Sequence, residues 1–118
     1  MLRVTFELSG EYGLQGNKRK VLNDVEKYIS KNINRLEKIL NADLQRSGFV
    51  TDSEKDLEIT DGFYVRFSIG GTYDIDGELT EDSYLEQDDY IDSVIHEVEK
   101  VLDTNIRDCE YVINIEKV

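Results

Sequence analysis

The feature that most constrains the fold of this 118-residue chain is a change between two hydrophobic periods along it. Near the N-terminus, apolar residues occupy every second position from Leu2 to Leu8, which is typical of a strand with one buried face. Between Val21 and Leu44 they recur at steps of three and four, the spacing of an amphipathic helix. Because elements with one apolar face must cover each other, the chain is expected to fold in layers.

The first helix is predicted to start at Asn17, whose side chain suits an N-cap, and to continue to about Leu44. Gly48 stands just beyond this end, where a glycine often terminates a helix. This helix carries seven of the fourteen Lys and Arg residues of the chain on its exposed face.

A hairpin is predicted after this helix. Leu57 and Ile59 precede Thr60-Asp61-Gly62, and apolar residues alternate again from Phe63 to Ile69. A three-residue loop ending in Gly62 keeps all of these apolar side chains on one face of the hairpin. The alternation continues past Gly70-Gly71, so this pair is either a bulge in one long strand or a second bend.

The second helix is predicted from about Leu85 to Thr104, because a second apolar stripe with helical spacing covers these residues. Ser83 and Glu86 have the spacing of a capping box at its start. A closing strand follows, with a buried set expected at Tyr111, Ile113 and Ile115.

The order strand, helix, two or three strands, helix, strand predicts an α+β fold. It matches the split βαβ or ferredoxin-like arrangement, with two helices on one face of an antiparallel sheet of four or five strands. Residues 1–118 are expected to form a single domain, because this length suits one core. The open face of the sheet would be polar, with Arg3, Thr5, Glu7, Tyr64, Arg66, Ser68 and Asn114 on it.

Composition narrows the chemistry available to this chain. With Cys109 as its one cysteine and His96 as its one histidine, it has no internal disulfide and no zinc site rich in thiolates. Neither glycine-rich segment has the spacing of a phosphate-binding loop. We therefore expect no cofactor and no catalytic centre. A cytoplasmic location is expected, in a bacterial or phage-infected cell, because the N-terminus lacks the pattern of a secretory signal.

The charge of the chain is strongly asymmetric. The formal net charge is -12, yet residues 1–50 hold nine bases against six acids. From Phe67 to Glu99 there is no Lys or Arg, and eleven residues are acidic. Net charge alone keeps a protein soluble, but solubility does not require such clustering. An acidic surface with exposed tyrosines repels nucleic acid and membrane phosphates and attracts basic proteins.

The predicted partner-binding surface lies within this segment and consists of Asp74, Asp76, Glu78, Glu81, Asp82, Tyr84, Glu86, Asp88, Asp89, Tyr90 and Asp92. Its carboxylates are expected to mimic a nucleic-acid backbone and to occupy the basic groove of a nuclease or another nucleic-acid-processing enzyme. Phage anti-defence proteins, including anti-CRISPR proteins, and immunity proteins against nuclease toxins offer an analogy in size and charge.

Two alternatives remain open from the sequence. The chain could be a structural or assembly module that forms a homodimer through the open sheet face, with its acidity serving solubility. It could also be a metal-dependent enzyme, because carboxylates suit hard divalent cations. The aspartates for such a site would be Asp74, Asp76, Asp88, Asp89 and Asp92. The twelve-residue calcium-loop pattern does not fit around Gly77.

Overall fold

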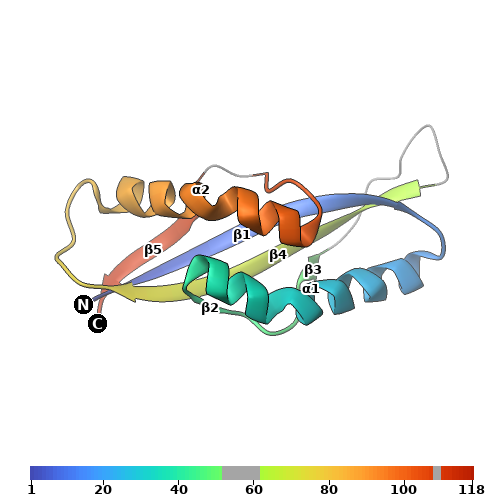
Figure 1. Cartoon of the computed structure of the whole chain (residues 1–118), viewed down its shortest axis with the longest axis horizontal. Coiled ribbons are helices and arrows are strands. Elements are labelled where there is room, and N and C mark those ends of the chain that lie inside the picture. The colour runs from blue at the N-terminus through green and yellow to red at the C-terminus, as the bar shows by residue number, and fades with distance from the viewer. Residues whose placement is uncertain (52–61, 108–109) are drawn as a thin grey trace.

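The computed structural model describes residues 1–51, 62–107 and 110–118. In chain order its elements are β1 (Leu2–Gln15), α1 (Lys18–Leu40), β2 (Asp43–Leu44), β3 (Val50–Thr51), β4 (Gly62–Ile75), α2 (Ser83–Leu102) and β5 (Val112–Lys117). The five-stranded antiparallel sheet has the order β2-β4-β1-β5, and β3 also pairs with β4. Both helices cover the same face of the sheet (Figure 1). The predicted α+β class is confirmed, and the order is roughly ferredoxin-like, with β2 and β3 sharing one edge position.

The two central strands, β1 and β4, form the longest pairing in the molecule. Each has 14 residues, and they pair without a shift from Leu2 opposite Ile75 to Gln15 opposite Gly62. The molecule is accordingly elongated, with extents of 51 × 25 × 21 Å. The predicted first strand is confirmed and continues beyond Leu8. Its even-numbered apolar residues and the odd-numbered ones of β4 face the helices and form the core.

Gly70 and Gly71 form neither a bulge against β1 nor a bend, since the pairing of β1 with β4 passes through them unbroken. Gly71 lies opposite Phe6. A Cβ atom at Gly71 would stand 2.5 Å from Cζ of Phe6 and 2.6 Å from Cδ2 of Leu44. The glycine therefore provides the space that these two core side chains occupy.

The expected extension of the first helix to Leu44 is wrong. The helix ends at Leu40, because Asn41 adopts a left-handed backbone with φ 51° and its N–H donates to the carbonyl of Glu37. Leu44 lies in β2 and is buried in the same core. Its spacing from Leu40 fits a helix only by coincidence. The N-cap at Asn17 is confirmed, since its side chain accepts a backbone hydrogen bond of 3.1 Å from the first turn.

The predicted capping box at the second helix is also wrong. Asp82 is the N-cap residue and makes no side-chain capping hydrogen bond. Ser83 is buried, and its Oγ accepts a hydrogen bond of 2.8 Å from the N–H of Thr80 in the preceding turn. The helix ends at Leu102 rather than Thr104, because Asp103 has a left-handed backbone with φ 56°.

The closing strand is confirmed in part. Tyr111 and Ile115 are buried, but Ile113 is 58% exposed. The register between β5 and β1 shifts here: Asn114 lies opposite Thr5, and Val112 lies opposite Phe6. Ile113 is the extra residue and loses its place on the core face. The predicted pairing of Leu57 and Ile59 with β4 lies outside the described residues.

The face of the sheet away from the helices is polar, as expected, and none of the seven predicted residues on it is buried. Ion pairs link its strands. Arg3 Nε lies 3.0 Å from Asp74 Oδ1, which joins β1 to β4. Glu11 lies 3.0 Å from Arg107 and 3.8 Å from Arg66.

Substitution of Gly71 by Ala should destabilise the protein by about 1–3 kcal/mol, because the added methyl group overlaps Phe6 and Leu44. Chemical denaturation measures this loss. Gly70→Ala is the matched control, since a Cβ there meets first the end of the Gln45 side chain, at 3.1 Å. In a Phe6→Leu background, Gly71→Ala should cost less than in the natural chain. Equal losses at the two glycines would show that the space beside Phe6 is not the constraint.

Candidate functional site

The eleven predicted partner-binding residues lie at one end of the molecule. They occupy the end of β4, the connection at 76–82 and the first half of α2. Both chain termini lie at this same end (Figure 1). Among the described residues, the side-chain polar groups of five of the eleven have partners within the fold, and those of the other six have none.

Asp74 is the first of the five with a partner. Its carboxylate forms two hydrogen bonds with the Arg3 guanidinium, of 3.0 and 3.3 Å, on the open face of the sheet. These hydrogen bonds lower the pKa of Asp74 and raise the pKa of Arg3. The negative charge of Asp74 is therefore already matched within the chain.

Asp88 and Tyr84 hold the edge strand β5 against α2. Oδ1 of Asp88 accepts hydrogen bonds of 2.9 Å from the N–H groups of both Tyr111 and Val112. One turn earlier, the hydroxyl of Tyr84 accepts one of 3.1 Å from the N–H of Ile115. Three backbone donors at this edge thus find their acceptors on α2 rather than in the sheet. Covering an edge strand in this way also protects it from pairing with another chain.

Tyr90 and Asp92 also have structural roles. The Tyr90 hydroxyl donates to the carbonyl of Leu40 at 2.7 Å, and its ring packs edge-on against Tyr73 with centroids 5.5 Å apart. Burial is the main cause that raises the pKa of the Tyr73 phenol above its ordinary value. Asp92 accepts a hydrogen bond of 3.3 Å from the Tyr111 hydroxyl. Tyr90 therefore joins the two helices and is not the exposed ring expected for an interface.

The other six predicted residues are all exposed, and we call them the acidic end: Asp76, Glu78, Glu81, Asp82, Glu86 and Asp89. Among the described residues, none of these six carboxylates takes part in an ion pair or a side-chain hydrogen bond. Asp82, the N-cap residue, is followed at steps of four and three by Glu86 and Asp89, which places the three on one side of the start of α2. The acidic end therefore presents concentrated negative charge to the solvent.

Exposed apolar side chains accompany these acids. Leu79 is 52% exposed, Leu85 63% and Tyr84 41%. Three more of the large apolar residues that are exposed in the described part of the chain lie on β5 or at the termini: Met1, Ile113 and Val118. The sequence pattern does not predict the exposure of Leu79 and Leu85, because Leu79 continues the alternation of β4 and Leu85 is in phase with the apolar stripe of α2. No signal in the sequence distinguishes them from core residues.

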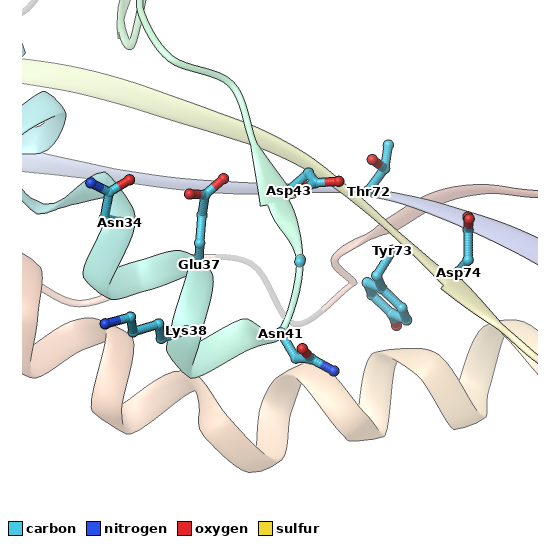
Figure 2. Close-up of a pocket in the computed structure, with 9 residues that line it drawn as sticks. Asn34, Glu37, Lys38, Asn41, Asp43, Thr72, Tyr73 and Asp74 are labelled. Carbon is cyan, nitrogen blue, oxygen red and sulfur yellow. The ribbon is translucent and has the colours of Figure 1, made fainter.

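A polar cavity of about 570 Å³ lies between the end of α1, β2 and β4 (Figure 2). Glu37 belongs to its lining, but its carboxylate accepts from the Leu44 N–H at 2.9 Å and pairs with Arg46 at 2.9 Å. Lys38 extends away from Asp74 in this view (Figure 2). The acids of this cavity thus include two whose charges are matched by arginines, Glu37 and Asp74.

The aspartates considered for a metal site are dispersed among different structural roles. Asp74 binds Arg3, and Asp88 binds the backbone before and within β5. Within residues 1–51, 62–107 and 110–118, no three His, Cys, Asp or Glu side chains are grouped for metal binding. His96, which the sequence places one turn from Asp92, pairs instead with Glu99 at 3.1 Å.

Comparison with known proteins gives no family for this chain: no protein-family model, curated protein or solved structure matches it. Neither helix in the described part of the chain has an apolar stretch of the length needed to cross a bilayer.

Asp88→Ala should destabilise the protein by roughly 1.5–3 kcal/mol, because two backbone N–H groups lose a charged acceptor. Amide hydrogen exchange at Tyr111 and Val112 should accelerate. Asp88→Asn keeps an acceptor oxygen and should lose less. The neighbouring Asp89→Ala is the control and should change the free energy of unfolding by less than about 0.5 kcal/mol. Unchanged protection of both amides in Asp88→Ala would contradict this role.

Proposed function

We propose that this protein is a small, non-enzymatic inhibitor that binds the basic nucleic-acid groove of a nuclease or another nucleic-acid-processing enzyme. Its contact surface is the acidic end together with Leu79, Tyr84 and Leu85. The carboxylates take the place of backbone phosphates, and the apolar side chains pack against the partner. The protein itself does not bind nucleic acid, because its own charge repels phosphate.

The observation that carries this proposal is the combination of charge and apolar exposure at one end. None of the six carboxylates of the acidic end forms an ion pair among the described residues. Charged groups of this kind steer encounter and give specificity, while packed apolar and aromatic contacts supply lasting affinity. Leu79 and Leu85 are 52% and 63% exposed, so they are available for such packing.

We propose a smaller contact set than the eleven residues predicted from the sequence. Asp74, Asp88, Tyr90 and Asp92 are held by contacts within the chain, so their substitution would disturb the fold as well as a partner. The acids proposed to contact the partner are therefore the six of the acidic end, which form no ion pair within the described residues. The connection at 76–82 is anchored by β4 on one side and by α2 on the other. This anchoring limits the conformational entropy that the connection loses on binding.

Reversal of Asp82, Glu86 and Asp89 to Lys should abolish capture of a basic partner from lysate while leaving the thermal unfolding cooperative. The immobilised natural chain should retain a nuclease, helicase or related enzyme that elutes with salt and is identified by mass spectrometry. Nucleic acid should then compete with the protein for that enzyme in direct binding. The matched control reverses three exposed acids outside the acidic end, Glu7, Glu97 and Glu110, with the same change in net charge.

Two results would contradict electrostatic mimicry. The first is equal loss of binding in both triple variants, which would mean that net charge rather than the acidic end matters. The second is a partner whose affinity for the natural chain is insensitive to salt and unaffected by nucleic acid.

Substitution of Leu79 and Leu85 by Ser tests the apolar part of the surface. Both side chains are largely exposed, so the free energy of unfolding should change little. Dissociation from the partner should accelerate about tenfold or more, while the dependence of affinity on salt stays the same. Surface plasmon resonance at several salt concentrations separates the two effects. An unchanged dissociation rate would remove both leucines from the interface.

A further inference from the structure

A groove distinct from the acidic end lies where the end of α2 meets the first half of α1 and the end of β1, with a volume of about 380 Å³. Its apolar lining includes Leu14, Val21 and Leu102. This groove is at the C-terminal end of α2, whereas the acidic end is at its N-terminal end. Nothing in the proposed inhibitory contact uses it.

Two tyrosines that line the groove are fixed by hydrogen bonds to the last turn of α2. The Tyr28 hydroxyl donates to the carbonyl of Val101 at 2.6 Å, and the Tyr12 hydroxyl donates to the carbonyl of Leu102. Burial raises the pKa of the Tyr12 phenol above its ordinary value, with smaller contributions from Tyr28 and Asp103. The groove has a rigid aromatic lining.

The charges that line the groove are all negative. Asp24 of α1 and Asp103 at the end of α2 belong to its lining, and no Lys, Arg or His does. Neither aspartate forms an ion pair within the described residues. Lys20 and Lys27 lie on the same helix as Asp24 but do not line the groove.

From this arrangement we propose that the groove binds a small organic ammonium ion with an apolar body. The ammonium group lies near Asp24 and Asp103, and its apolar part packs against Leu14, Val21 and the tyrosines. Aromatic rings favour such cations through their negative faces, and the effect grows as the cation is desolvated. An anion would meet two carboxylates and no base in the lining of the groove, so the charge selects the ligand class. This inference is independent of the proposed inhibitory function.

The test compares two probes of similar shape, phenylethylammonium and the neutral 2-phenylethanol. In heteronuclear NMR titrations of the full chain, the ammonium probe should shift the amide signals of Leu14, Val21 and Tyr28 in a saturable way. The alcohol should bind about tenfold more weakly, since it lacks the charge. Equal affinity for the two probes would overturn the proposal. So would ammonium-induced shifts confined to the acidic end.

Two conservative variants test whether the carboxylates of the groove hold the ammonium group. Asp24→Asn and Asp103→Asn should each weaken binding of the ammonium probe several-fold and leave the alcohol unaffected. Asn tolerates the left-handed backbone at Asp103, so the fold is retained. Asp43→Asn, an exposed acid of β2 outside the groove, is the matched control and should not change binding. Unchanged ammonium binding in the Asp24→Asn, Asp103→Asn double variant would show that these carboxylates do not recognise the cation.

Discussion

The unbroken pairing of β1 with β4 is the constraint on which the rest of the structure depends. It extends over all 14 residues of each strand and fixes which side chains face the helices. A shift of one residue would move the apolar set of β1 to the open face, where Arg3 and Glu11 now form ion pairs. Gly71 belongs to the same constraint, since the pairing brings it opposite Phe6, where a larger residue would overlap the ring.

A second principle of this fold is that helix carboxylates bind backbone N–H groups of the irregular segments. Glu26 of α1 accepts from three consecutive residues, 48–50, at 2.6 to 3.3 Å. Glu37 accepts from the N–H of Leu44 in β2, and Asp88 accepts from the two N–H groups at the start of β5. Glu99 accepts from the N–H of Ile106, which follows α2. Buried or half-buried donors need acceptors, and hydrogen bonds to a charged group are among the stronger ones. Part of the acidity of the chain therefore stabilises its own fold.

The acids of this chain fall into two groups, those with a partner inside the fold and those whose charge faces the solvent. Carboxylates with backbone or arginine partners stabilise the protein, whereas the acidic end leaves its charge to the solvent beside exposed leucines. The two surfaces for which we propose binding partners lie at the two ends of α2. One offers many free carboxylates and suits a large basic partner. The other offers two carboxylates in a narrow aromatic groove and suits a small cation.

The amino-acid sequence by itself determined the class of fold, both helices and the acidic segment, because hydrophobic period and charge are local properties of the chain. It did not determine where the first helix ends, since Leu44 fits the helical spacing and the sheet equally well. Nor did it reveal that Tyr90 is packed between the helices while Leu85 is exposed. Only the tertiary structure decided which acids are free, because that depends on backbone donors and bases brought close from distant parts of the chain.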